Sequence, residues 1–247
     1  GVRKTDFPPS LHYHQPWWRV YGHFNRYVAR ILTVLSAGSH EAGILLLHPI
    51  ESAWLITDPK DHTQYRWDTF RRLYRGTEVA SLNDDFVALS SQLLDLHRDY
   101  DYGDETIMSR HAAVEDGRFR VGSKTYDAVV VPRSLTIRRS TFALLEEYRR
   151  AGGTIILAGE PPSMIEGEPS RELKPFWDAC IRTDGTKASL KAALGLLPEP
   201  SVTVSGPDAA DLDSLYCHER AVDGMKVLFM VNIRKSDTVE ADVSVMH

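Results

Sequence analysis

The stretch Ala42 to Trp54, AGILLLHPIESAW, decides the fold class of this chain. Its four consecutive apolar residues, Ile44 to Leu47, are typical of a strand buried on both faces, as in a parallel sheet covered by helices. Proline cannot donate a hydrogen bond to a central ladder, so Pro49 predicts that the strand ends by His48. The loop that follows lies at the carboxyl end of the strand, where open α/β sheets bind ligands. The alternative is that His48 and Trp54 only pack this loop against the sheet.

Two further apolar runs repeat this pattern, at Tyr126 to Val131 and at Thr154 to Leu157. Between them, Ser140 to Arg150 has apolar residues at three- and four-residue steps, which is typical of a helix. A strand, a helix and a second strand at this spacing predict a βαβ unit on a parallel sheet. We therefore predict an α/β fold with a doubly wound parallel sheet. The three apolar strands should be neighbours or near-neighbours in it, with helices on both faces.

The remaining chain contains weaker signals of regular structure. Apolar periodicity predicts three more helices: Tyr21 to Leu35, Asp61 to Arg75, and a helix capped by Asn83-Asp84-Asp85 that runs through Phe86 to Leu96. Asp-Gly pairs at Asp116-Gly117 and Asp223-Gly224 predict two hairpins. The alternation in Val239 to Met246 predicts a strand.

These elements suggest three regions. Residues 1–37 are interpreted as the tail end of a preceding domain, residues 38–197 as the α/β domain, and residues 198–247 as the opening strands of a β-rich domain. The segment Phe7 to Trp18 is dense in aromatic residues and needs a surface to bury against. We expect this segment to be poorly ordered or to dock on a neighbouring molecule. The whole chain is interpreted as a piece of a larger polypeptide.

The bulk composition excludes several classes of function. The net charge is −5, from 29 basic and 34 acidic residues, so no basic surplus predicts nucleic-acid binding. No apolar run approaches the roughly 20 residues of a membrane span, and the first ten residues lack the apolar core of a signal peptide. We therefore expect a soluble protein that is either cytoplasmic or secreted. Cys180 and Cys217 are predicted to be two buried free thiols. No cofactor and no metal site is predicted.

The sequence lacks the motifs of three common kinds of catalytic or binding site. No glycine-rich turn or phosphate-binding lysine follows the first strand, which excludes the common nucleotide-binding motifs. The turns after the other two strands carry no cysteine, and Ser134 lacks the flanking glycines of a nucleophile elbow. No histidine and cysteine residues have the spacing of a zinc site; His12 and His14 are expected to form local hydrogen bonds.

Carboxylates at predicted strand ends remain as candidates: Glu51, Asp101, Asp104, Glu105 and Glu160. Glycoside hydrolysis uses a pair of carboxylates, and carboxylates with aromatic residues also bind sugars without catalysis. A solvated acidic rim is the alternative, and it is favoured for Asp101 and Asp104. Glu51 is the most informative because Trp54 follows it by three residues.

A linked series of motifs resembles large bacterial glycoside hydrolases of the α-L-rhamnosidase type, glycoside hydrolase family 106. The series is FPPSLHYHQPWW (7–18), LLLHPIESAW (45–54), HRDYDYGDE (97–105), VEDGRFRVGSKTYDAVVVPRSLTIRRST (114–141) and AGGTIILAG (151–159), with a looser match in YCHERAVDGMKVLFMVN (216–232). In such proteins a (β/α)-barrel carries the catalytic carboxylates, and the first motif lies near its end. A domain resembling class I glutamine amidotransferases, without their catalytic cysteine, follows. Family 42 β-galactosidases use a similar domain for trimerisation.

The resemblance implies a flavodoxin-like, amidotransferase-like domain in an accessory role. Almost all of the barrel is missing from this sequence, so no catalytic residue is carried over. We expect a non-catalytic accessory or structural piece of a glycoside hydrolase. Its expected partners are the catalytic barrel of the same polypeptide, a carbohydrate bound by the whole protein, and further copies of the chain in a homo-oligomer. The expected sugar-site rim consists of His48, Glu51, Trp54, Asp104 and Glu105. The alternative is a free-standing α/β binding or oligomerisation module unrelated to sugars.

Overall fold

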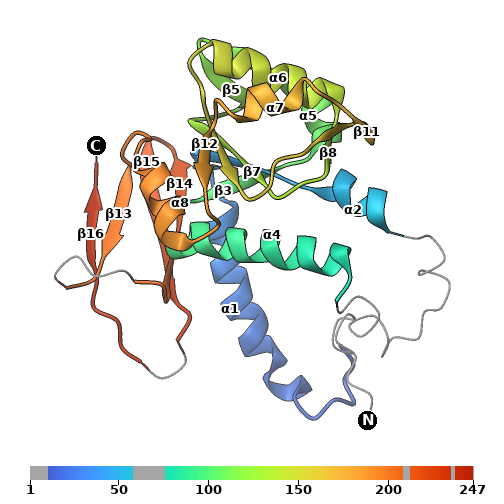
Figure 1. Cartoon of the computed structure of the whole chain (residues 1–247). Coiled ribbons are helices and arrows are strands. Elements are labelled where there is room, and N and C mark those ends of the chain that lie inside the picture. Colours follow the sequence, from blue (N-terminus) through green and yellow to red (C-terminus); the bar gives the residue numbers. More distant parts are fainter. Residues whose placement is uncertain (1–10, 58–75, 208–211, 235–236, 247) are drawn as a thin grey trace. The chain divides into compact units, whose positions relative to one another are not determined.

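The computed structural model describes residues 11–57, 76–207, 212–234 and 237–246 (Figure 1). The chain divides into two compact units. The first consists of Gly1–His40 and Glu219–Phe229, and the second of Glu41–His218 and Met230–His247. The predicted helix at Asp61 to Arg75 lies outside the described residues.

The second unit is built on a five-stranded parallel sheet with the strand order β12-β9-β7-β2-β3. Its strands are β2 (Ile44–Leu47), β3 (Tyr100–Gly103), β7 (Ala128–Pro132), β9 (Thr154–Ala158) and β12 (Ile181–Thr183). Ile44 pairs with Ala128, and Ala128 pairs in turn with Thr154, all in parallel ladders. The predicted neighbourhood of the three apolar strands is confirmed, and the fold class is α/β.

Helices cover both faces of this sheet, as predicted (Figure 1). Leu45 and Leu47 point into a core shared with α5 (Glu105–His111), α6 (Arg139–Arg150) and α7 (Leu173–Trp177). Ile44 and Leu46 point the other way, into a core shared with α4 (Glu78–Asp95) and α8 (Lys187–Leu194). Successive side chains of a strand face opposite sides, so a continuous apolar run serves two cores.

Two sequence predictions need correction in this unit. Helix α4 begins at Glu78, not after Asn83–Asp85, because the hydroxyl of Thr77 accepts a hydrogen bond from the amide of Ala80 at 3.3 Å and caps the helix. The apolar run from Tyr126 is also not one strand, because Tyr126 ends β6 (Lys124–Tyr126) and β7 begins two residues later.

Three small sheets complete the second unit. Strands β4 (Ala112–Glu115), β5 (Arg118–Val121) and β6 form an antiparallel sheet. Its predicted first hairpin is confirmed, and Asp116 and Gly117 have the positive φ angles of 49° and 75° that such a turn requires. The others join β8 (Thr136–Ile137) with β10 (Met164–Ile165) and β11 (Glu168–Pro169), and β13 (Val202–Ser205) with β16 (Asp242–Val245).

The first unit contains α1 (Trp18–Ser36), which confirms the predicted amino-terminal helix, and the short strand β1 (Ser39–His40). Strand β1 pairs antiparallel with the end of β14 (Leu215–Val222), which is followed by β15 (Met225–Asn232). Gly38 has φ +57°, and a Cβ there would lie 1.8 Å from the carbonyl oxygen of Ala221, so only glycine fits. Within the described part of the chain, no helix combines the length and apolar character needed to cross a bilayer.

Candidate functional site

The candidate site lies at the carboxyl edge of the parallel sheet. Strand β2 is paired with β3 on one side and with β7 on the other, so the loops that follow these three strands share one edge. They begin with His48, Asp104 and Arg133. This is the edge at which open α/β sheets bind their ligands.

Arg138 forms hydrogen bonds with two of the predicted rim carboxylates. Glu51 lies in α2 (Ile50–Ile56), and its Oε1 accepts a hydrogen bond from Nε of Arg138 at 2.6 Å. Glu105 is only 2% exposed, and its Oε2 accepts the backbone N–H of Arg138 at 2.8 Å. A single residue therefore holds one carboxylate with its side chain and the other with its backbone.

Burial raises the pKa of the Glu105 carboxyl above its ordinary value, and the neighbouring Glu51 carboxylate raises it further. The hydrogen bond from the Arg138 amide and the Arg138 guanidinium act in the opposite direction and stabilise the charged form. The net result is a carboxyl that takes up a proton more readily than a free glutamate does. It lies between helices rather than in solvent, so its contacts are internal.

The first prediction concerns this carboxyl. Below its ordinary pKa of 4.5, Glu105 is protonated in the folded and unfolded states and has no effect on pH dependence. Above that value the unfolded chain loses the proton first, so the free energy of unfolding falls as the pH rises toward the folded pKa. We expect Glu105→Gln to remove this fall, measured by urea unfolding between about pH 4 and about pH 8.

Glu115→Gln is the matched control because its shift has the opposite sign. The hydrogen bond from Arg120 lowers the pKa of the exposed Glu115, so its stabilising effect is lost as the pH falls. The Glu115 effect lies below the ordinary pKa of 4.5, so Glu115→Gln should leave the fall in stability above pH 4.5 unchanged and should alter the slope, with the opposite sign, only below that value. Equal slopes in wild type and Glu105→Gln would contradict the assignment.

The other three predicted rim residues have separate surroundings. Asp104 caps α5, where its Oδ1 accepts the amide of Ile107 at 2.9 Å. The ring of His48 lies 5.3 Å from that of Phe86, in an aromatic cluster. Trp54 is 61% exposed on α2. The structure thus brings Glu51 and Glu105 to one arginine but does not bring His48 or Trp54 to it, and the rim stays a prediction.

The remaining candidates are occupied by internal contacts. Asp101 lies within β3, not at a strand end as predicted, and its Oδ2 accepts hydrogen bonds from Lys124 at 2.6 Å and from Tyr126 at 3.1 Å. Ser134 is 4% exposed and donates its hydroxyl to the carbonyl of Pro132, which agrees with a turn role. The carbonyl of Glu160 accepts the Ser134 amide at 3.1 Å.

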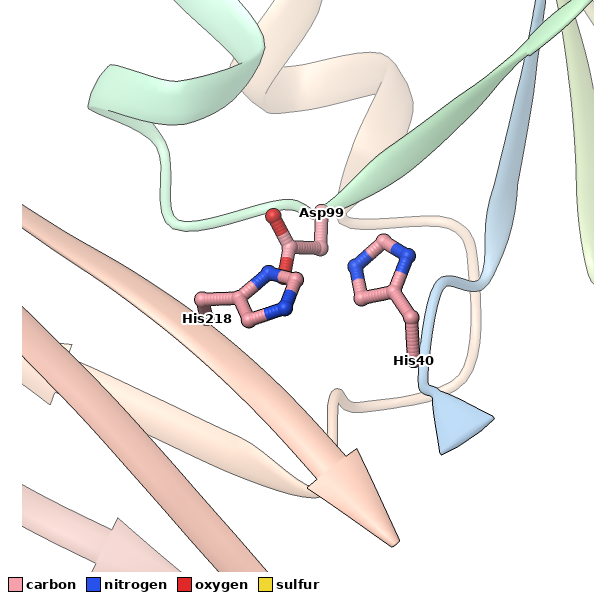
Figure 2. Close-up of side chains that lie close together, drawn as sticks. All are labelled: His40, Asp99 and His218. Carbon is pink, nitrogen blue, oxygen red and sulfur yellow. The ribbon is translucent and has the colours of Figure 1, made fainter. Parts of the chain in front are cut away.

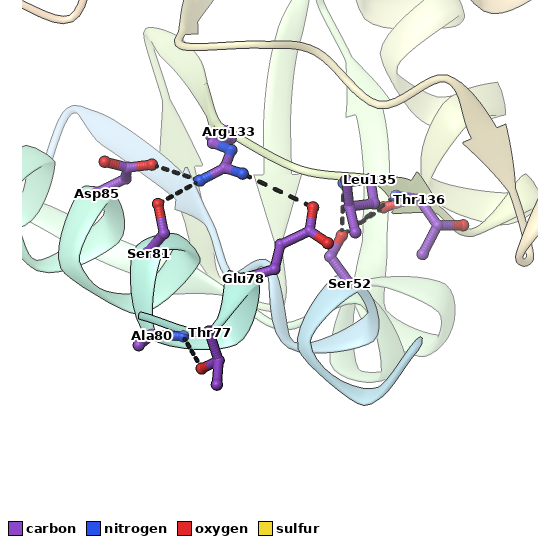
Figure 3. A network of polar contacts seen from close by, with 9 residues as sticks. All are labelled: Ser52, Thr77, Glu78, Ala80, Ser81, Asp85, Arg133, Leu135 and Thr136. Carbon is purple, nitrogen blue, oxygen red and sulfur yellow. Dashed lines mark hydrogen bonds and ion pairs between the residues drawn. The ribbon is translucent and has the colours of Figure 1, made fainter. Parts of the chain in front are cut away.

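Sequence reasoning missed two residues that organise this edge (Figure 3). The hydroxyl of Ser52 is fully buried; it accepts the amides of Leu135 at 2.9 Å and Thr136 at 3.2 Å and donates to the carbonyl of Thr136. Arg133 donates to Ser81 at 2.8 Å and to Asp85 at 2.9 Å on α4. The position of Arg133 directly after a buried strand was the one available signal.

Other reactive groups of the second unit are also paired or partly buried. Figure 2 shows His218 beside Asp99, with 3.4 Å between Nδ1 and the carboxylate. Cys180 and Cys217 are half-buried rather than buried as predicted. Burial raises the pKa of the Cys180 thiol to about 11, so this thiol is protonated at neutral pH and is a poor nucleophile.

Comparison with known proteins adds little. No protein-family model matches the sequence, and no curated protein matches it. Among solved structures, the apo exo-carrageenase of family GH42 from Bacteroides ovatus is similar, with a TM-score of 0.42 and 20% sequence identity. The match covers 64% of this chain but only 21% of that enzyme. At this distance no residue role is transferred.

Proposed function

We propose that this chain is a non-catalytic accessory region of a glycoside hydrolase of the α-L-rhamnosidase type. Its second unit is then a doubly wound, amidotransferase-like domain without a nucleophile, and its partner is a catalytic barrel in the same polypeptide. The carbohydrate is bound by that larger protein. The linked motifs quoted from the sequence carry the family assignment.

One structural observation carries the non-catalytic role: the carboxylates of the sheet edge are committed to internal contacts. Glu51 is paired with Arg138, Glu105 is buried against the Arg138 amide, and Asp104 caps a helix. Glycoside hydrolysis requires two carboxyl groups about 5 to 9.5 Å apart that face a scissile bond. A carboxylate held by an arginine or a helix end favours a structural role over proton transfer.

The strand order supports the domain assignment. Numbered by their order in the chain, the five parallel strands are arranged 2-1-3-4-5 across the sheet, the order of flavodoxin-like folds. Amidotransferase-like chemistry needs a reactive cysteine, but Cys180 lies just before β12 with a raised pKa rather than on a turn after a strand. The fold is therefore compatible with an amidotransferase-like scaffold that has no catalytic residue of that kind.

The second prediction follows from this proposal. The purified chain should show no turnover of aryl rhamnosides above the buffer rate, because Glu51, Glu105 and Asp104 are held in internal contacts at the sheet edge. Glu51→Gln should be indistinguishable from wild type in the same assay. Turnover by the wild type that Glu51→Gln abolishes would contradict the proposal, since it would assign Glu51 to catalysis.

A free-standing α/β module unrelated to sugars is the competing proposal, and the aromatic cluster of His48, Phe86 and Tyr102 fits either. The reading frame of the gene separates the two. A barrel-sized coding stretch upstream of residue 1 supports the accessory role, whereas a start codon close to residue 1 supports the free-standing module.

A further inference from the structure

Tyr102 is an exposed aromatic residue whose hydroxyl is anchored to a neighbouring helix. It lies on the edge strand β3, and 55% of it is exposed to solvent. Its hydroxyl donates to Oγ of Ser90 on α4 at 3.3 Å, and the hydroxyl of Tyr100 lies 3.3 Å from it. Ser90 donates in turn to the carbonyl of Phe86 at 2.9 Å. The far end of the Tyr102 side chain therefore has a fixed position against α4.

The ring of Tyr102 also contacts three other rings. Its centroid lies 5.3 Å from those of Phe86 and Tyr100 and 6.1 Å from that of His48. The pair with Tyr100 is edge-to-face, which is a preferred geometry of aromatic pairs. Because these contacts order the ring in advance, a ligand that stacks on it would cause little further loss of side-chain entropy.

Two polar side chains near this ring have atoms that are open to a ligand. Within the described ranges of the chain, His48 forms ring contacts, but neither nitrogen of its imidazole forms a hydrogen bond. A neutral imidazole supplies one donor and one acceptor. Asp104 directly follows β3, and its Oδ1 accepts the Ile107 amide, whereas its Oδ2 accepts no hydrogen bond from the described residues.

These groups lie where the fold places ligands. His48 begins the loop after β2 and Asp104 begins the loop after β3, so both are at the carboxyl edge of the parallel sheet. Tyr102 pairs with Leu46, whose side chain points into the core shared with α4. The tyrosine is therefore on the same face of the sheet as α4, one residue before the end of its strand.

We propose that Tyr102 is a stacking surface for a pyranose ring, with His48 and Asp104 as hydrogen-bond partners of the sugar hydroxyl groups. The choice of a sugar rests on the proposed function. A pyranose ring has a face of C–H groups and a rim of hydroxyl groups. The face of a tyrosine ring carries partial negative charge and attracts C–H groups, while the imidazole and the carboxylate match the rim. A rhamnoside also has a methyl group that enlarges its apolar surface.

The charge at this strand end favours a neutral sugar over a nucleotide. A nucleobase also stacks on aromatic rings. Its phosphates, however, require positive charge nearby. The charged residue that follows Tyr102 at the end of β3 is the carboxylate of Asp104, which would repel a phosphate and accept a hydroxyl proton instead.

The third prediction tests this stacking by titrating the full chain with methyl α-L-rhamnopyranoside, followed by ¹H–¹⁵N NMR. The wild type should bind with a dissociation constant of about 1 mM, since one ring and a few hydrogen bonds give weak affinity. Tyr102→Ala should raise this constant by about 10-fold or more, because stacking on a single aromatic ring has an effect of this size. Tyr102→Phe keeps the ring and should stay within about threefold of the wild type.

Tyr27→Ala is the matched control. Tyr27 is 59% exposed on α1, so this variant loses an equally exposed tyrosine elsewhere in the chain and should bind like the wild type. Circular dichroism checks the fold of each variant. If Tyr102→Ala does not fold, His48→Ala takes its place and should raise the dissociation constant by about fivefold through the lost hydrogen bond.

Three results would overturn the inference: no chemical-shift change in the wild type at sugar concentrations far above the expected dissociation constant, the same changes with glycerol, or undiminished binding by Tyr102→Ala. These results can be told apart from a failure of the proposed function. A barrel-sized coding stretch upstream of residue 1 together with no binding would contradict the stacking alone. Binding at Tyr102 in a chain whose start codon is close to residue 1 would contradict the accessory role alone.

Discussion

Trp177→Ala is expected to lower the free energy of unfolding by about 3–5 kcal/mol. Trp177, the last residue of α7, is 1% exposed in the core that α7 shares with α6, and its ring lies 4.7 Å from that of Phe176 and 6.4 Å from that of Phe142. Its indole N–H also donates to the carbonyl of Pro162 at 2.9 Å, which fixes the loop after β9. Alanine would leave a cavity and an unpaired buried carbonyl at once.

Urea unfolding followed by circular dichroism measures this loss, and Trp54→Ala is the matched control. Trp54 is 61% exposed, so its replacement should change the free energy of unfolding by no more than about 0.5 kcal/mol. Trp177→Phe should fall between the two, because it keeps a ring but loses the donor. Similar losses in Trp177→Ala and Trp54→Ala would show that the burial assignment is wrong.

Ser52→Ala is expected to have the second largest effect, lowering the free energy of unfolding by about 2–4 kcal/mol. The hydroxyl of Ser52 is the acceptor for two backbone amides, the partly buried one of Leu135 and the buried one of Thr136. An unsatisfied buried donor costs about 1–3 kcal/mol. The methyl group of alanine cannot accept a hydrogen bond, so both amides would lose this acceptor. The effect should therefore exceed that of an ordinary serine replacement.

Hydrogen exchange gives this prediction a local measurement. The amides of Leu135 and Thr136 should exchange faster in Ser52→Ala, while those of the central strands change only through the lower global stability. Ser91→Ala, at an exposed position of α4, is the control and should be neutral or slightly stabilising. An unchanged exchange rate at Leu135 would contradict the role assigned to Ser52.

The centre of the sheet could be predicted from the sequence because burial on both faces leaves an unbroken apolar run. Strands β2, β7 and β9 carry that mark. Strand β3, with the sequence YDYG, does not, because it lies at the edge of the sheet and Asp101 pairs with Lys124 there. Strand β12, at the other edge, is only three residues long and is similarly weak in pattern. Edge strands need less apolar surface, so periodicity alone does not find them.

In the candidate site, too, only some of the residues could be predicted from the sequence. The carboxylates could be identified because they follow predicted strands. Their partner could not, since Arg138 is 87 residues from Glu51 and 33 from Glu105 in the chain. No local pattern records a pairing over such distances. The fully buried Ser52 was missed for a related reason, because a single serine in a helix gives no sign of the backbone amides it will meet.

The two hydrogen bonds of Arg138 differ in whether they depend on the identity of its side chain. Glu105 is held by a main-chain amide, which every residue except proline supplies. Glu51 is held by a guanidinium, which only arginine supplies. As related sequences diverge, Glu51 and position 138 should therefore change together, whereas Glu105 can persist beside many residues at that position. Covariation between related sequences would then reveal the contact of Glu51 with Arg138 but not the contact of Glu105 with the Arg138 amide.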